Sequence, residues 1–255
     1  MRPIYIIAMN TYREIIRDRI LYGLFVFAVL LIGVSIALGQ LSFAEQARIS
    51  ANFGFTAIHL SAVILSIFVG STLVAREIDK KTILTLLVRP VSRLQFLLGK
   101  SFGLSLVILT AVTFLAIILS LVFIGVEMPI NELFFKALYG VMLESILLLG
   151  VTVFFSTFCS PFMVVSFTIG FFLIGHWIHS LQFFSGKSSS EAFRLLTNGI
   201  VMIIPDLERF NWRSHFIYGD VVSFKEIALA TGYSFLWFTF LITFTSFIFS
   251  RRDLG

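Results

Sequence analysis

Six runs of apolar residues dominate this chain, and each is long enough to cross the hydrocarbon core of a bilayer, which takes about 20 residues. They lie near residues 20–41, 53–75, 101–126, 137–158, 162–184 and 227–250. The sequence is 58% hydrophobic and only 13% charged, whereas about a quarter of the residues in an average soluble domain are charged. We therefore expect an all-α, polytopic membrane protein with six transmembrane helices.

The positions of the basic residues predict the orientation of these spans, because short loops rich in Lys and Arg stay on the cytoplasmic side. With the N-terminus inside, twelve of the 19 Lys and Arg residues fall in cytoplasmic segments, and most of the others fall in one long outer segment. Both termini are therefore expected to be cytoplasmic, in a multi-pass protein of the cell (inner) membrane. Because the basic residues flank apolar runs, the net charge of +5 indicates topology and no nucleic-acid partner.

The stretch 75–102, AREIDKKTILTLLVRPVSRLQFLLGKSF, has the pattern of two helices separated by a break. Asp79 is suited to cap the first helix, and Pro90 ends it because proline disfavours helical geometry at the preceding residue. The apolar side chains of this first helix share one face: Ile83, Leu86 and Leu87. Ser92 and Gln95 have the spacing of a capping box, which predicts the start of the second helix.

The outer segment 185–226 is too apolar over residues 193–204 for a solvated loop. A short interfacial or re-entrant helical piece that ends at Pro205 is therefore expected, since such backbone is tolerated near a membrane when protein buries it. At the other end of the chain, apolar residues recur at helical spacing over 3–19 with charged residues opposite. This pattern predicts an amphipathic helix that lies in the plane of the membrane interface.

Glu144 is the only carboxylate well inside a predicted span, and ionisable residues in spans are candidates for function. Counting about 1.5 Å per residue places Glu144, His59 and His176 at similar depths, roughly 9–12 Å below the outer ends of their helices. The three side chains are therefore a candidate intramembrane polar cluster; the alternative is that Glu144 bonds to one neighbour and only holds helices together. His176 and His179 share a helix face, but they lack a third ligand, so no metal site is predicted.

Short motifs give no sign of catalysis. Ser185 to Ser188 read like the end of a phosphate-binding loop, but the earlier glycine of that motif is replaced by Leu181. No catalytic residue is predicted, and any ATP that drives the protein must bind another chain. Gly99 and Gly103 have the spacing that allows two helices to approach closely.

The segment from Ala75 to Lys100 resembles the region between the second and third spans of ABC-2 type permeases. Those proteins show an acidic residue, a Thr-x-x-x-Leu-Leu core, Arg-Pro-x-Ser-Arg and then Leu-Gly-Lys. The matching residues are Glu77, Thr82 with Leu86 and Leu87, Arg89-Pro90-Val91-Ser92-Arg93 and Leu98-Gly99-Lys100. The N-terminal stretch 12–19 resembles the family's elbow helix, and the outer part of the chain resembles permeases of copper-enzyme maturation systems such as nitrous-oxide reductase assembly.

This resemblance implies a single transmembrane permease domain over 1–255, with an elbow helix at 1–19, a coupling-helix loop at 76–92 and the outer segment at 185–226. The chain would be the transmembrane subunit of an ATP-binding-cassette exporter, with a cytoplasmic coupling helix between spans 2 and 3. The residues implied in ATPase coupling are Glu77, Lys80, Thr82, Ile83, Leu86, Leu87, Arg89, Pro90 and Arg93.

The same resemblance implies the partners. Two such subunits, or two related ones, would pair with two cytosolic ABC ATPase subunits that bind ATP and Mg²⁺, so no cofactor is expected in this chain. Membrane lipids and an extracytoplasmic accessory protein complete the expected partners. Two other functions stay open: an ion-coupled secondary transporter that uses Glu144, and a membrane anchor that holds a partner complex and transports nothing.

Overall fold

The computed structural model describes residues 2–40, 46–72 and 92–251, and every regular element in those ranges is a helix. In chain order the elements are α1 (Arg2–Ile16), α2 (Arg19–Gln40), α3 (Gln46–Ile64), the π-helix η1 (Leu65–Val69), α6 (Arg93–Gly125), α7 (Glu132–Ser156), α8 (Pro161–Lys187), α9 (Glu191–Ile203), the 3-10 helix η2 (Glu208–Phe210), α10 (Arg213–Tyr218) and α11 (Phe224–Arg251). The predicted all-α fold is confirmed.

Within the described residues, five helices are long and apolar enough to cross a membrane. They are Gln46–Thr72, which joins α3 to η1, then α6, α7, α8 and Phe224–Ile248 of α11. The first predicted span corresponds to α2, whose shorter stretch Leu21–Val34 is apolar. A multi-pass membrane fold is therefore confirmed, whereas the count of six spans stays a prediction.

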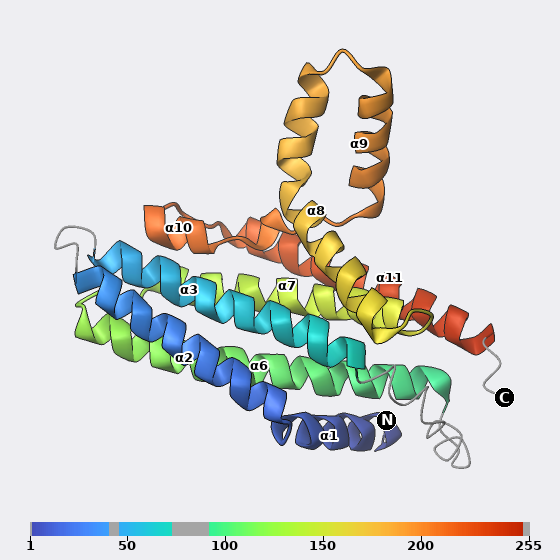
Figure 1. Ribbon diagram of the computed structural model, residues 1–255, viewed down its shortest axis with the longest axis horizontal. Helices are drawn as coiled ribbons and strands as arrows, with labels where there is room; N and C mark the ends of the chain where they lie inside the picture. The colour runs from blue at the N-terminus through green and yellow to red at the C-terminus, as the bar shows by residue number, and fades with distance from the viewer. Residues whose placement is uncertain (1, 41–45, 73–91, 252–255) are drawn as a thin grey trace.

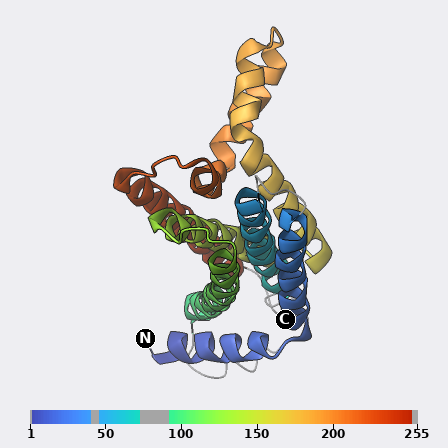
Figure 2. The ribbon, with the colours of Figure 1, turned by 90° about the vertical axis from the view of Figure 1, so that its left-hand side faces the viewer.

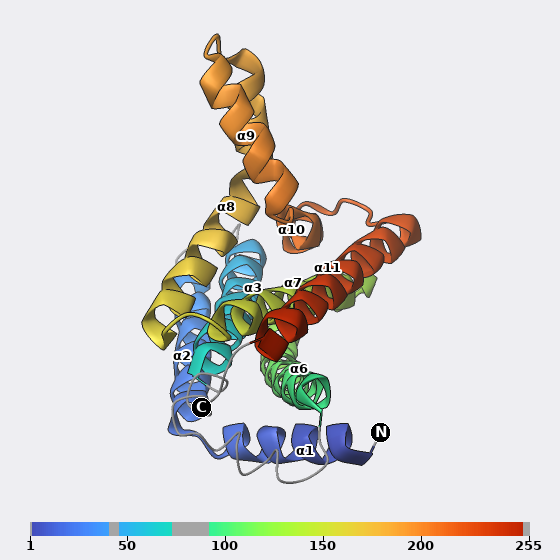
Figure 3. The same ribbon diagram turned by 90° about the vertical axis from the view of Figure 1, so that its right-hand side faces the viewer.

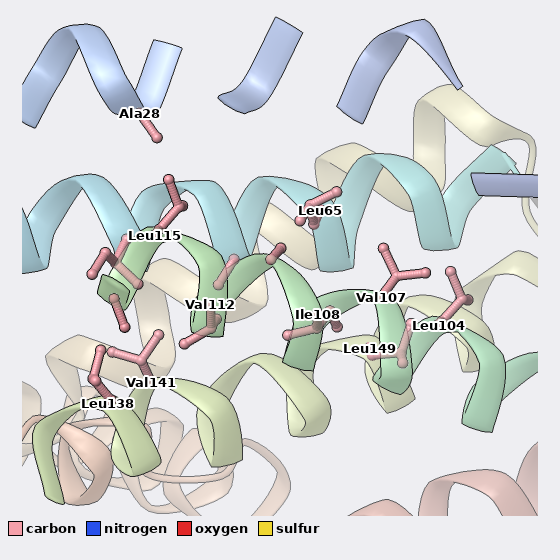
Figure 4. Close-up of a cluster of buried hydrophobic side chains, with 14 of the residues drawn as sticks. Ala28, Leu65, Leu104, Val107, Ile108, Val112, Leu115, Leu138, Val141 and Leu149 are labelled. Carbon is pink, nitrogen blue, oxygen red and sulfur yellow. The ribbon is translucent and has the colours of Figure 1, made fainter. Parts of the chain in front are cut away.

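The core of the bundle is built around α6 and α7. Figure 1 shows α2, α3, α6 and α7 running side by side, with α11 along the far side of α7. Branched side chains of α6, among them Val107, Val112 and Leu115, fill the space between α3 and α7 (Figure 4). Because α3 and α7 bury this apolar face, α6 is held against both helices.

Aromatic packing closes one end of this core. The rings of Phe55, Phe123, Phe134 and Phe216 come from α3, α6, α7 and α10, and their centroids lie 5.1 to 6.2 Å apart. All four side chains are buried. Aromatic rings in edge and offset contacts stabilise a core beyond the area that they bury, so this cluster ties the segment around α10 to three long helices.

Side-chain caps explain where several helices begin. Ser92 accepts a hydrogen bond from the Gln95 backbone N–H at 3.2 Å, and the Gln95 side chain accepts one from the Ser92 N–H at 3.1 Å. The predicted capping box is thus confirmed, and α6 begins at Arg93. Asn131 caps α7 in the same way, through the backbone N–H groups of Leu133 and Phe134.

Helix α1 crosses the beginning of α6 in close contact (Figures 2 and 3). A Cβ atom added to Gly99 would lie 2.7 Å from Ile7 Cβ, and one added to Gly103 would lie 2.6 Å from the Ala8 carbonyl oxygen. The two glycines therefore allow the close helix contact that their spacing predicts. On the predicted apolar face of α1, Ala8 and Ile15 are buried while Tyr5 is exposed.

The outer segment contains the predicted helical piece. Helix α9 ends at Ile203, two residues before Pro205, and its N-terminus is capped by the Ser190 hydroxyl. Figure 1 shows that α8 and α9 form a hairpin whose tip projects away from the bundle. After α9, the chain returns to the bundle, where Leu207 and Phe210 are fully buried with side chains of α7.

Candidate functional site: a buried polar cluster

Three ionisable side chains from three helices meet inside the bundle. His59 of α3, Glu144 of α7 and His176 of α8 are the residues that the sequence predicts as an intramembrane polar cluster. The Nε2 atom of His59 lies 2.8 Å from Glu144 Oε1, and the Nε2 atom of His176 lies 3.5 Å from the same oxygen. The Glu144 side chain is only 1% exposed, against 7% for His59 and 17% for His176.

A π-helical turn lies beside the cluster and links α3 to α7. Ser66 of η1 has its hydroxyl 2.9 Å from the carbonyl oxygens of both Ala62 and Ser145, and Ser145 follows Glu144 in the chain. Single π-helical turns within α-helices occur often at functional sites. The widened turn lets a buried hydroxyl reach across to α7, so the helix segments that carry His59 and Glu144 are held together.

An aromatic side chain packs against both histidines. The Phe172 ring centroid lies 4.6 Å from that of His176 and 5.9 Å from that of His59. The Phe172 carbonyl oxygen also lies 3.2 Å from His176 Nδ1. Since a carbonyl oxygen can only accept, His176 Nδ1 carries a proton and donates a hydrogen bond to Phe172. This bond fixes the orientation of the ring.

The hydrogen bonding of the cluster is incomplete within the described part of the chain. Glu144 Oε2 and His176 Nε2 are buried atoms with no hydrogen-bond partner there. Buried polar groups nearly always have a partner, so each exception calls for an explanation. His59, Glu144 and His176 are also a group whose ligand atoms all lie within 4.8 Å of one another, a spacing at which a metal ion can bind.

Arg213, at the start of α10, is a basic residue outside the spans whose charge interacts with that of Glu144. Burial lowers the pKa of the Arg213 guanidinium, and the negative charges of Glu144 and Glu208 partly offset this effect. Its Nε donates a hydrogen bond to Asn211 Oδ1 at 3.1 Å. Arg213 therefore acts on the cluster through its field, because the direct ion-pair contacts of Glu144 among the described residues are those with the two histidines.

A second polar cluster lies one turn farther along α8 and was not predicted. Asp206 Oδ2 accepts hydrogen bonds from His179 Nε2 at 3.1 Å and from Arg209 Nε at 3.0 Å. The Asp206 backbone N–H donates to the Tyr233 hydroxyl at 2.9 Å, and the Arg209 guanidinium lies over the Tyr233 ring. The structure thus separates His176 from His179, the pair that the sequence places on one face, and gives each a different carboxylate.

Asp206 and Arg209 are not among the candidate site residues that the sequence predicts. Their contacts depend on the path of the chain back from α9, where the Leu207 N–H donates to the Gly175 carbonyl oxygen at 3.1 Å. A Cβ atom on Gly175 would lie 2.7 Å from Leu207 Cγ. The glycine beside His176 was the one local signal that another segment approaches α8 at this level.

The residues implied in ATPase coupling lie almost entirely outside the described ranges. These are Glu77, Lys80, Thr82, Ile83, Leu86, Leu87, Arg89 and Pro90. Arg93 is described as the first residue of α6. The coupling helix therefore stays a prediction, together with the role of its apolar face.

A comparison with protein-family models identifies a family for this chain. The model described as "ABC-2 family transporter protein" matches residues 17–185, which is more than half of the chain. The matched region includes α2 to α7 and most of α8, and thus all three residues of the buried polar cluster. A search of curated proteins finds no match.

Proposed function

Because the chain belongs to the ABC-2 family of transporter proteins and is thus a membrane subunit without ATPase activity of its own, we propose that it is the transmembrane subunit of a type-2 exporter. A separate cytosolic ATPase hydrolyses ATP with Mg²⁺, and the conformational change moves a substrate across the cell (inner) membrane. Two copies of the chain, or one copy and a related permease, pair with two ATPase subunits. The observation that carries this proposal is the family match across residues 17–185, which includes the whole predicted coupling stretch.

The contact between α1 and α6 supports a mechanical role for that stretch. Gly99 and Gly103 bring the backbones of the two helices together, and the buried Lys100 Nζ lies 3.9 Å from Glu14 Oε2. A displacement applied just before the capped start of α6 is passed to α1 and to the bundle together, because packed helices move as rigid bodies. In this proposal α1 is the elbow helix, and both termini are cytoplasmic.

The helices at the edge of the bundle suit the remaining partners. Most residues in the apolar windows of α8 and α11 are not buried within this chain, in contrast to those of α3 and α7. Lipid and a second permease copy are suitable neighbours for such surfaces. The hairpin of α8 and α9 extends on the proposed outer side, where an extracytoplasmic accessory protein would bind.

A second candidate function rests on Glu144. A buried carboxylate between two histidines is a common arrangement for ion or proton coupling, so an ion-coupled secondary transporter is the alternative. The two functions differ in one requirement, since a secondary transporter works in vesicles without any ATPase. Transport that persists when the ATPase is omitted would favour this alternative.

The proposal is tested by truncating the expected coupling helix. Leu86→Ala removes about 2–3 kcal/mol of apolar burial if the side chain anchors in the ATPase, which weakens docking by roughly ten- to a hundred-fold. Lys81→Ala is the matched control in the same stretch, because an exposed charge at the rim contributes mainly to the rate of encounter. Copurification of the cytosolic ATPase and the rate of ATP hydrolysis are measured for each variant. Unchanged docking and hydrolysis in Leu86→Ala, Leu87→Ala and the double variant would contradict the coupling role.

A further inference from the structure

The polar cluster inside the bundle places a ring nitrogen and a carboxylate oxygen opposite each other. His176 Nδ1 donates a hydrogen bond to the Phe172 carbonyl oxygen at 3.2 Å, so Nε2 is the ring nitrogen that is left to bind a ligand. His176 Nε2 lies 3.5 Å from Glu144 Oε1. A cation bound between the two atoms would satisfy both in this buried site, where an unpaired polar group is costly.

The spacing of the three side chains suits a metal ion. In a tetrahedral zinc site the metal lies about 2.0–2.2 Å from nitrogen and oxygen ligands, which puts neighbouring ligand atoms about 3.3 Å apart. The two distances to Glu144 Oε1, 2.8 Å from His59 Nε2 and 3.5 Å from His176 Nε2, bracket that value. The ligand atoms of all three residues lie within 4.8 Å of one another, so small side-chain rotations complete the geometry.

Two further features are typical of metal ligands. A histidine that binds a metal usually donates its other ring N–H to a carbonyl or carboxylate, which fixes the ring, and His176 does so with Phe172. Glu144 also has a second carboxylate oxygen, Oε2, that is buried and has no partner among the described residues. Two of the buried polar atoms that have no hydrogen-bond partner among the described residues, Glu144 Oε2 and His176 Nε2, belong to this cluster.

We propose that His59, Glu144 and His176 form a binding site for a divalent first-row transition-metal ion, with Zn²⁺ the best fit, inside the membrane-spanning bundle. Two imidazoles and a carboxylate bind such ions in preference to Mg²⁺ or Ca²⁺. Three protein ligands leave a fourth coordination position for water or another ligand. Metal binding at this site does not require the coupling of the chain to an ATPase, so the metal site and the proposed function are tested independently.

Charge and access set the expected behaviour of the site. The hydrogen bond between His59 and Glu144 contains one proton, and a metal ion that takes its place releases it, so the affinity rises with pH. Arg213 opposes the incoming charge, and Glu208 partly balances that effect. His176 has the most exposed side chain of the three, so the ion reaches the site from the side of α8.

The experiment measures metal binding to the tag-free, full-length chain in detergent. Zn²⁺ is titrated against a chromophoric chelator, and Co²⁺ is added separately to record the visible absorption bands of a four-coordinate site. We expect one ion per chain, and Glu144→Gln and His176→Gln should each weaken Zn²⁺ binding by tenfold or more and abolish the Co²⁺ bands. His179→Gln is the matched control, because His179 lies three residues along the same helix and contacts Asp206 instead.

Several results would contradict the proposed metal site. One is the absence of saturable Zn²⁺ binding and of Co²⁺ bands in the wild-type chain at pH 8, which would mean that a proton alone fills the cluster. Another is equal binding by the wild type, Glu144→Gln and His176→Gln, or an equal loss in His179→Gln. If the cluster variants do not fold, the wild-type Co²⁺ spectrum and its loss on lowering the pH decide the question.

Discussion

The two polar clusters along α8 use the same residue types, yet they have opposite electrostatic character. The outer carboxylate, Asp206, has a guanidinium as a direct partner, and its partners His179 and Arg209 have side chains that are 62% and 56% exposed. The inner carboxylate, Glu144, is 1% exposed, and its direct ion-pair partners among the described residues are histidines. The outer cluster is therefore compensated in charge, whereas the inner one is compensated only when a histidine gains a proton or a metal ion binds.

This difference indicates a division of roles. Each cluster contains a buried carboxylate oxygen that has no hydrogen-bond partner among the described residues, Glu144 Oε2 and Asp206 Oδ1. The presence of such an oxygen therefore does not distinguish the clusters. They differ in that Asp206 pairs with an arginine, whereas Glu144 pairs only with histidines among the described residues. We infer that the outer cluster fixes the returning chain to α8 and α11, and that the inner cluster binds a cation.

The largest expected difference between the clusters is in stability. Glu144→Ala removes the partner of His59 in a buried pair, which costs about 3–5 kcal/mol of unfolding free energy. Asp206→Ala should cost only about 1 kcal/mol, because the side chains that pair with Asp206 are half-exposed and regain water. Reversible denaturation in mixed detergent micelles measures both values. Equal losses of unfolding free energy, or a larger loss in Asp206→Ala, would show that the outer cluster contributes at least as much to stability as the inner one.

A smaller effect on stability is expected at Gly175, which lies beside His176 and packs against the segment that carries Asp206. Gly175→Ala places a Cβ atom 2.7 Å from Leu207 Cγ and 3.0 Å from the Pro205 carbonyl oxygen, and the resulting overpacking costs about 1–3 kcal/mol. Gly170 is the matched control on the same helix, since a Cβ atom there meets nothing within 4 Å. Gly170→Ala should be neutral or stabilise the helix by about 0.5–1 kcal/mol. The same denaturation measurement applies, and a tolerated Gly175→Ala would mean that the returning chain is not held against α8.

The smallest expected effect concerns the π-helical turn. Ser66→Ala removes the hydroxyl that links η1 to the Ser145 carbonyl oxygen, which should cost about 1 kcal/mol. The control is Ser166→Ala, where an exposed hydroxyl bonds only to its own helix at Phe162, and a change within about 0.5 kcal/mol is expected. Thermal unfolding of the two variants side by side compares them. If both lose the same stability, the bond between the helices contributes nothing of its own.

Much of this fold follows from local sequence signals. The apolar runs predict the positions of the long helices, and the spacing of Ser92 and Gln95 predicts the start of α6. Helix geometry also predicts that Glu144, His59 and His176 lie at one depth, because a continuous helix rises by a constant amount per residue. These predictions share one basis, since each depends on a periodicity or a cap that a few neighbouring residues define.

Contacts between distant segments could not be predicted in the same way. The π-helical turn at Leu65–Val69 has no local signal, since its hydroxyl bond reaches a residue in another helix. Depth alone could not show that His176 faces Glu144 while His179 faces Asp206, because both histidines lie on one side of α8. Asp206 itself is positioned by the path of the chain after α9, which only the folded structure defines.

We infer that the inner cluster takes part in the work of the transporter and that the outer cluster does not. The most direct test is the rate of ATP hydrolysis by the permease reconstituted with its cytosolic ATPase in lipid nanodiscs. Glu144→Gln keeps the size of the side chain but removes its charge and replaces one acceptor oxygen with a donor. It should retain ATPase docking while lowering the coupled rate by about tenfold or more, equivalent to about 1.4 kcal/mol. Asp206→Asn should stay within about twofold of the wild-type rate, since the side chains that pair with Asp206 are half-exposed. Full activity in Glu144→Gln, or an equal loss in Asp206→Asn, would contradict the claim.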